Sequence, residues 1–145
     1  MSKYAQGKYI PKHPEKYVGN HTPSYRSSWE LAFFNFCDNH PSITQWASES
    51  IRIPYRNPLS GKNTTYVPDI FMVYLDANGV SHAVLIEIKP SAQATMEAAK
   101  SQRDKLAVAL NIAKWTAARA FCANTGLTFR VVSEQDLWAG GKNKY

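Results

Sequence analysis

Three charged residues lie within two apolar runs whose composition is typical of β-strands. Asp69 falls in the first run, Tyr66–Leu75, while Glu87 and Lys89 fall in the second, Ala83–Pro90. Because Glu87 and Lys89 are two residues apart, both side chains project from the same face of a strand. Burying an unpaired charge costs free energy, so charges at these positions need a partner or a function. Two carboxylates and one ammonium group suit the hydrolysis of a phosphodiester bond.

The carboxylates of Asp69 and Glu87 supply the hard oxygen ligands that Mg²⁺ prefers, and this ion keeps several of its waters. The backbone carbonyl of Ile88 could add another oxygen. Bound Mg²⁺ lowers the pKa of a water and balances the charge that develops on the phosphate. Lys89 would orient that water and stabilise the same charge. In the alternative interpretation, Asp69 and Lys89 form an ion pair on a solvent-facing strand.

Whether Asp69 meets Glu87 depends on the turn between the two runs. The intervening Asp76-Ala-Asn-Gly79 is typical of a β-hairpin. A two-residue loop would place Asp69 opposite Ile88, with its carboxylate on the wrong face. A three-residue loop with a left-handed Gly79 in a G1 bulge places Asp69 opposite Glu87 instead. We predict this second register, which brings the two carboxylates and the lysine to one patch.

A helix that precedes the hairpin could contribute a further acid. Thr22–Pro23 offers an N-cap residue followed by proline at the first helical position. Apolar residues at helical spacing predict a core-facing stripe made of Tyr25, Trp29, Ala32, Phe33, Phe36 and Cys37. Glu30 lies at the edge of this stripe, where an ordinary surface glutamate is the alternative interpretation. Arg26 precedes Glu30 by four residues, which is the weaker orientation for a helical ion pair.

The remaining periodicity predicts an α/β protein with a mixed sheet. Strands are expected outside the hairpin at residues 43–47, 51–55 and 127–132. After Pro90 the pattern is helical from residue 91 to residue 124, as one kinked helix or as two helices broken near Asn111. Gly126 is a natural stop for this helical stretch. Because the last strand follows a helical crossover, it is expected to pair in parallel.

The composition favours a polyanionic partner. Lys and Arg number 17 against 11 Asp and Glu, which leaves a net charge of +6. This surplus suits nucleic acid, although it can also simply keep a domain of 145 residues soluble. There is neither a signal-peptide pattern nor an apolar run near the ~20 residues of a membrane span. Cys37 and Cys122 are expected to be reduced core residues, and the histidines lack zinc-ligand spacing.

Two terminal segments flank the predicted domain, which spans residues 22–139. Residues 1–21 interleave lysines with tyrosines and predict a basic, extended arm. This arm could lie along phosphates, or it could wrap the domain and insert its tyrosines into the surface, and the two alternatives can hold together. Residues 135–138 are expected to form one helical turn, and residues 140–145 a flexible basic tail.

The order of Pro68-Asp69, Glu87-Ile-Lys89 and an upstream helical Glu30 resembles the PD-(D/E)xK nuclease superfamily. A closer resemblance extends over nearly the whole chain, to the head-completion nucleases of tailed phages. Their site layout is similar to that of transposon end-cleaving endonucleases. The segments that carry this closer resemblance are Gly7-Lys-Tyr-Ile-Pro-Lys12, Pro14-Glu-Lys-Tyr17, Tyr25-Arg-Ser-Ser-Trp-Glu30, Tyr66-Val-Pro-Asp-Ile70 and Ile86-Glu-Ile-Lys-Pro90.

The resemblance implies a restriction-endonuclease-like core, in which helices flank a central mixed sheet of about four or five strands. It implies that Asp69 and Glu87 are metal ligands and that Lys89 is the catalytic lysine. It also implies that Glu30 is a helix-borne acid, able to bind the metal directly or through water. The implied cofactor is Mg²⁺, for which Mn²⁺ is expected to substitute.

The implied function is to cleave or trim packaged DNA, by endonuclease and exonuclease action, so that a phage head can join its tail. This would take place in the host cytoplasm or in association with the virion, with capsid portal or neck proteins as candidate partners. DNA contacts are expected from Arg26, from Lys62 in a basic turn, and from Arg103 on the later helix. The alternatives are a catalytically silent head-completion protein that binds DNA ends or docks on the portal, and a transposon-type endonuclease subunit.

Overall fold

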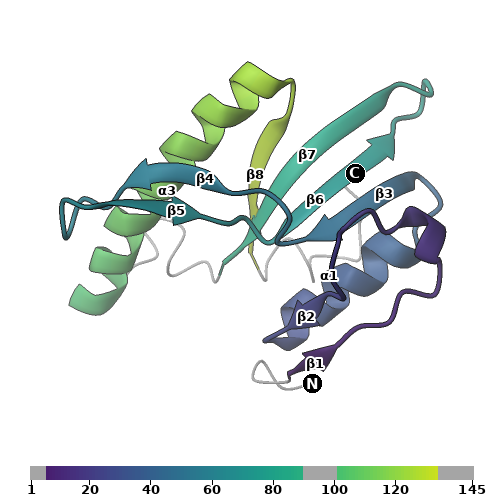
Figure 1. Cartoon of the computed structure of the whole chain (residues 1–145), viewed down its shortest axis with the longest axis horizontal. Coiled ribbons are helices and arrows are strands. Elements are labelled where there is room, and N and C mark those ends of the chain that lie inside the picture. The colour runs from purple at the N-terminus through teal and green to yellow at the C-terminus, as the bar shows by residue number, and fades with distance from the viewer. Residues whose placement is uncertain (1–5, 90–100, 134–145) are drawn as a thin grey trace.

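The computed structural model describes residues 6–89 and 101–133, and its centre is a four-stranded sheet in the order β3-β6-β7-β8 (Figure 1). These strands are β3 (Ile43–Ser48), β6 (Ile70–Leu75), β7 (Ser81–Ile88) and β8 (Thr128–Val132). The final strand β8 runs parallel to β7, while the other neighbours are antiparallel. The predicted mixed α/β sheet is therefore confirmed, and the arrangement is that of a restriction-endonuclease-like core.

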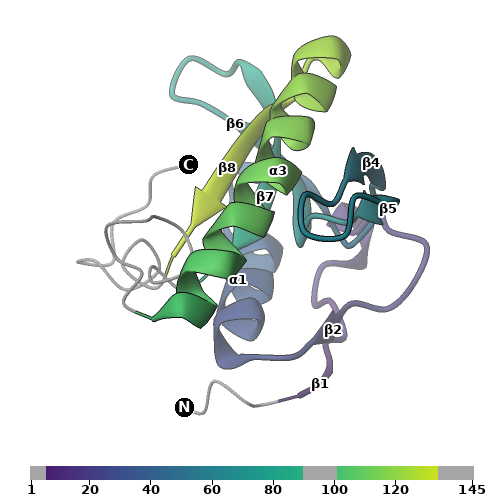
Figure 2. The ribbon, with the colours of Figure 1, turned by 90° about the vertical axis from the view of Figure 1, so that its left-hand side faces the viewer.

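Helices α1 (Ser28–Asn39) and α3 (Gln102–Thr125) cover opposite faces of this sheet (Figures 1 and 2). Successive residues of a strand point to opposite faces, so β7 contributes to both cores. Its Ile86 is buried in the cluster that α1 covers. Its Leu85 is buried with Trp115 of α3 in the second cluster. The odd-numbered residues of β7 therefore face α3.

Helix α1 begins later than predicted, at Ser28. Residues Ser24–Tyr25 form β2, which pairs with β1 (Gly7–Lys8), so the chain is extended where a helix was expected. The N-cap is Ser27, whose hydroxyl accepts the N–H of Glu30 at 3.2 Å. The prediction of Thr22–Pro23 as the start was wrong because a tertiary strand pairing outweighs that local signal. The spacing from Ser27 to Glu30 is that of a capping box, although the Glu30 carboxylate accepts the N–H of Arg26 instead of that of Ser27.

The stripe predicted on α1 is correct in part. Phe33 and Cys37 are buried as predicted, and Phe36 is partly buried against the same core. Phe34, which was not in the predicted stripe, is also buried. Tyr25 lies before the helix, so it cannot be part of a helical face. The inclusion of Tyr25 in the predicted stripe was wrong because the helix begins three residues later, at Ser28.

The first apolar run of the predicted hairpin is not one strand. Tyr66 belongs to a separate two-stranded sheet, and Pro68 has no N–H to donate to a ladder. The two strands of this small sheet are β4 (Ile53–Arg56) and β5 (Asn63–Tyr66). At Asp69 the backbone carbonyl accepts the N–H of Glu49 at 3.0 Å. The chain therefore crosses from the small sheet to the central sheet at residues 67–69, and Asp69 lies at the end of this crossing.

The turn between β6 and β7 has the predicted geometry. Gly79 adopts a left-handed φ of 78°, a conformation that side chains with a Cβ rarely take. Ile70 lies directly opposite Ile86 in the antiparallel ladder. Extending this register by one residue places Asp69 opposite Glu87. The predicted three-residue loop and its register are confirmed.

Helix α3 continues across Asn111 without interruption, so the alternative of two helices broken there is wrong. It ends as predicted at Gly126, whose φ is 76°. The predicted helical start at residue 91 lies outside the described residues, as do the turn at 135–138 and the tail at 140–145. Within the described ranges, neither helix is long and apolar enough to cross a membrane.

The N-terminal segment wraps the domain and inserts tyrosines into it. Tyr9 is buried in the core beside α1. Tyr17 follows the short 3₁₀ helix η1 (Pro14–Lys16) and packs edge-on against Trp46, with ring centroids 4.7 Å apart. Of the two roles considered for this segment, insertion into the surface is therefore observed for Tyr9 and Tyr17.

A buried carboxylate fastens this segment to α1. Asp38 is fully buried, and its carboxylate accepts the O–H of Tyr9 and the backbone N–H groups of Lys12 at 2.7 Å and His13 at 3.0 Å. Burial alone would raise the pKa of Asp38, but these hydrogen bonds together hold it below its usual value. Asp38 therefore ties three residues of the N-terminal segment to the end of α1.

Replacing Asp38 by asparagine should destabilise the protein by about 2–4 kcal/mol, because one amide oxygen cannot replace a charged acceptor of three hydrogen bonds. Urea unfolding, followed by circular dichroism, measures this loss. Glu15→Gln is the matched control, since Glu15 is exposed and should shift the midpoint very little. Equal midpoints for the two variants would contradict the structural role of Asp38.

The contribution of Asp38 should also depend on pH. Its pKa is lower in the folded protein than in the unfolded chain, so folding is favoured above the unfolded value of about 3.9. This stabilisation is lost as the pH falls through the folded pKa. The difference in unfolding free energy between wild type and Asp38→Asn should therefore be largest near neutral pH and shrink in acid. A constant difference down to about pH 2 would contradict this.

Candidate active site

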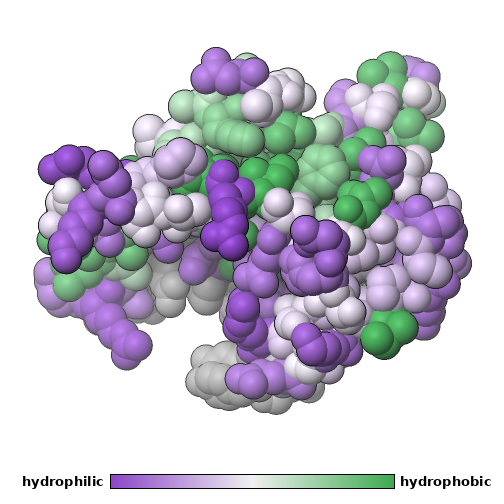
Figure 3. Space-filling view, in the orientation of Figure 1, coloured by the Kyte–Doolittle hydropathy of each residue, from purple (hydrophilic) through white to green (hydrophobic). Residues whose placement is uncertain are grey.

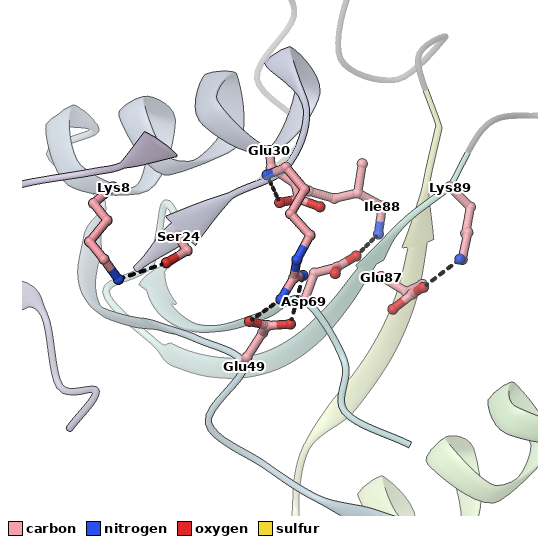
Figure 4. A network of polar contacts seen from close by, with 9 residues as sticks. Lys8, Ser24, Glu30, Glu49, Asp69, Glu87, Ile88 and Lys89 are labelled. Carbon is pink, nitrogen blue, oxygen red and sulfur yellow. Dashed lines mark hydrogen bonds and ion pairs between the residues drawn. The ribbon is translucent and has the colours of Figure 1, made fainter. Parts of the chain in front are cut away.

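Asp69 and Ile88 form one side of the site, where the β6 and β7 ladder ends. The N–H of Ile88 donates to the Asp69 carboxylate at 2.7 Å (Figure 4). In an extended strand the N–H and C=O of one residue point to the same side. The carbonyl of Ile88 is therefore directed toward the Asp69 side of β7. This direction is needed if the Ile88 carbonyl and the Asp69 carboxylate are to bind the same ion.

Glu87 forms the other side of the site, on the face that α3 covers. Its side chain is buried, and the O–H of Tyr66 donates to Oε1 at 2.8 Å. The ammonium group of Lys89 lies 3.5 Å from the other carboxylate oxygen. Both oxygens of Glu87 therefore have a partner, and Lys89 pairs with Glu87 rather than with Asp69. The alternative Asp69–Lys89 ion pair is not formed.

The two carboxylates oppose each other's ionisation. Burial raises the pKa of Asp69 well above its usual value, and the negative charge of Glu87 raises it further. Burial also raises the pKa of Glu87, although Lys89 and the Tyr66 hydroxyl offset part of this effect. Since both charged forms are disfavoured, a cation placed between these oxygens would be strongly attracted.

The donor set suits a hard divalent cation. In the described part of the chain, no three side chains of His, Cys, Asp or Glu form a ready metal cluster. The oxygens that we assign as candidate ligands are the two carboxylates of Asp69 and Glu87, with the carbonyl of Ile88. Such a set is compatible with Mg²⁺, which binds through one or two carboxylates and keeps several waters.

Glu30 approaches from the α1 side of the sheet and does not join Glu87 directly. Its carboxylate accepts the backbone N–H of Arg26 at 2.8 Å. Glu30 and Asp69 line the same narrow pocket, together with Glu49. Burial raises the pKa of Glu30, and the hydrogen bond from Arg26 offsets part of this effect. Glu30 therefore stands beside Asp69, at the far side of the site from Lys89 (Figure 4).

Arg26 forms a different ion pair from the one considered in the sequence. Its guanidinium binds Glu49 through two hydrogen bonds, of 3.1 and 3.4 Å. Arg26 precedes α1, so it cannot form a helical ion pair with Glu30. The other two proposed DNA contacts, Lys62 and Arg103, are exposed, in the β4–β5 turn and in the first turn of α3.

Three residues near the site were not found from the sequence. Glu49 has a left-handed φ of 48°, which is rare for a residue with a side chain. Tyr66 holds Glu87, and the Lys114 ammonium lies 5.7 Å from the centre of the Tyr66 ring. The pKa of Lys114 is lowered by burial and then by the charge of Lys89. No local pattern marks Glu49 or Lys114, whereas Tyr66 stands three residues before Asp69 and could have been considered.

Comparison with known proteins shows the family of this chain. The family described as TnsA-like endonuclease, N terminal, matches residues 40–134, which include the crossing, the hairpin and α3. The head completion nuclease of Enterobacteria phage T4 is 36% identical over 146 residues, which cover 93% of this chain and 95% of that protein. The chain therefore belongs to the TnsA-like endonuclease family and is a relative of the phage head completion nucleases.

Proposed function

We propose that this protein is a Mg²⁺-dependent DNA nuclease that cleaves DNA during phage head completion. The observation that carries the proposal is the gathering of Asp69, Glu87 and Lys89 at the end of β7, in a nuclease family. The relative from phage T4 supports the place of this reaction in head completion. Capsid portal or neck proteins are the partners that such a step would need.

Each residue of the candidate site would have a separate role. Asp69, Glu87 and the Ile88 carbonyl would hold Mg²⁺, which when bound supplies a water of lowered pKa and a positive charge beside the phosphate. Lys89 would stabilise the negative charge that develops on the phosphate oxygens. Glu30 would be a further acidic residue on the Asp69 side and would bind the metal directly or through water. Phosphate contacts away from the bond would come from Arg26, Lys62 and Arg103.

Incubation with supercoiled plasmid and with linear duplex tests the proposal. Nicked and linear plasmid should form with Mg²⁺ or Mn²⁺ and should not form with EDTA, since the two carboxylates alone cannot activate a water. Shortening of linear duplex would add exonuclease action. If every divalent cation leaves both substrates intact while DNA ends are still bound, the protein is a silent end-binding or portal-docking protein, and the proposal fails.

Tyr66→Phe tests the arrangement around Glu87. Loss of the hydroxyl should lower kcat by about 10–100-fold, as is usual when a residue that orients a metal ligand is removed. Mg²⁺ affinity should weaken in calorimetry, and KM for DNA should change little. Tyr55→Phe is a control on the same small sheet and should cut DNA normally. A normal kcat for Tyr66→Phe would show that this hydrogen bond is only structural.

A further inference from the structure

The small sheet forms an arm whose two ends are fixed at the candidate site. We define the arm as residues 52–66, which include β4, β5 and the turn between them. It is distinct from the N-terminal segment of residues 1–21. It starts three residues after Glu49, which is bound to Arg26, and ends at Tyr66, which holds Glu87. The arm extends away from these residues across α3 (Figures 1 and 2). A molecule that lies against the arm would therefore also lie near the site.

The two faces of the arm differ in character. One face carries Ile53 and Tyr55, which pack on the core that α3 covers. The other face is exposed and carries Arg52 and Arg56, with Lys62 in the turn. None of these three cations forms an ion pair within the described part of the chain. The sequence between Glu49 and Asp69 contains no acidic residue, so the arm is uniformly positive.

The turn of the arm holds a defined shape. The side-chain oxygen of Asn57 accepts the N–H groups of Leu59 at 2.8 Å and Ser60 at 3.3 Å. The backbone N–H of Asn57 donates to the Lys62 carbonyl at 2.9 Å, and Gly61 supplies a left-handed φ of 74°. Leu59 is nevertheless 56% exposed. A structured turn thus holds the apolar side chain of Leu59 in solvent, and in the sequence Arg56 and Lys62 flank it. Figure 3 shows mainly hydrophilic residues at the left-hand end of the molecule, where the arm lies.

We infer that the arm binds duplex DNA along its phosphate backbone, beside the bond that is cut. This inference rests on the proposed function and names the element that would hold the substrate. Unpaired arginines and a lysine without nearby acids match a polyanion with regularly spaced charges. Leu59 then lies against the minor groove, where DNA-binding proteins often place apolar side chains. The contacts carry no base preference, because they go to phosphates and sugars.

The salt dependence of binding tests the charges of the arm. Binding of a 30-base-pair duplex is measured in Ca²⁺, so that it is not cut, between about 50 and 200 mM salt. Arg56→Ala and Lys62→Ala should each reduce the slope of log affinity against log salt by about 0.9, and the double variant by about 2. Arg119→Ala removes one exposed charge from α3, outside the arm, and should leave the slope unchanged.

A fluorescent label tests the contact of the turn itself. The native Cys37 and Cys122 are buried, so a Leu59→Cys variant can be labelled at that position alone. Its emission should change on addition of the duplex, with the same affinity as unlabelled protein. Val80→Cys is the control, because Val80 is 52% exposed in the turn of the other hairpin, and its label should stay silent.

The outcomes separate this inference from the proposed function. If wild type binds and cuts DNA while the arm variants keep the full salt slope and the label at position 59 stays silent, the inference is wrong and the nuclease function stands. If wild type neither binds nor cuts DNA, the proposed function fails and the inference fails with it. A reduced slope together with a responding label supports the inference.

Discussion

Replacing Asp69 by asparagine should abolish DNA cleavage and at the same time make the folded protein more stable. The site would lose one of its two carboxylates, and with it several kcal/mol of stabilisation in the transition state. Cleavage should therefore fall by about a thousandfold or more. The asparagine oxygen can still accept the N–H of Ile88, so the local structure should persist.

The gain in stability follows from the raised pKa of Asp69. Burial and the charge of Glu87 favour the protonated form in the folded state, so folding binds a proton that the unfolded chain releases. The stability of wild type should therefore fall as the pH rises above the unfolded pKa of about 3.9, and Asp69→Asn should lack this fall.

At pH 7 the variant should be at least about 1 kcal/mol more stable in urea unfolding. Asp104→Asn, in the first turn of α3, is the control and should change neither cleavage nor the pH dependence. If Asp69→Asn were less stable than wild type and equally active, Asp69 would be a structural acid and the proposed site would be misplaced.

Replacing Lys89 by methionine should lower kcat by about 100–1,000-fold, which is the usual cost of removing one group that stabilises the charge of a transition state. Methionine is similar in length and apolar, so it keeps the packing of a side chain that is only 26% exposed. DNA affinity in Ca²⁺ should change little, because Lys89 faces Glu87 rather than the open surface.

Two further variants separate the charge of Lys89 from its position. Lys89→Arg keeps the charge and should recover part of kcat. Lys12→Met removes an exposed lysine of the N-terminal segment and should cut like wild type. Should Lys89→Met raise KM and leave kcat unchanged, Lys89 would bind substrate without stabilising the reaction, and its proposed role would be wrong.

The parts of the site that lie on regular elements could be predicted from the sequence. Alternation along β7 and into the next residue places Glu87 and Lys89 on one face. A turn with a left-handed Gly79 sets the register of Asp69. Both depend on interactions between residues close in sequence. The end of α3 at Gly126 is predictable for the same reason.

The missed features depend on contacts between distant segments. The start of α1 has two local signals, at Thr22 and at Ser27, and the pairing of β2 with β1 decides between them. Lys114 comes near Glu87 only because α3 packs across the sheet. Glu49 adopts its left-handed backbone where its N–H binds the Asp69 carbonyl. None of these contacts has a periodic signature.

Because Tyr66 at the end of β5 binds Glu87, DNA binding at the arm and ion binding at the candidate site would be thermodynamically linked. The backbone of Tyr66 lies in the arm and its hydroxyl binds Glu87, so a molecule bound to the arm would also restrict the Glu87 carboxylate. Such linkage is reciprocal. DNA on the arm should raise the affinity for Mg²⁺ by the same factor by which Mg²⁺ raises the affinity for DNA, and the enzyme would load its cofactor best when its substrate is already in place.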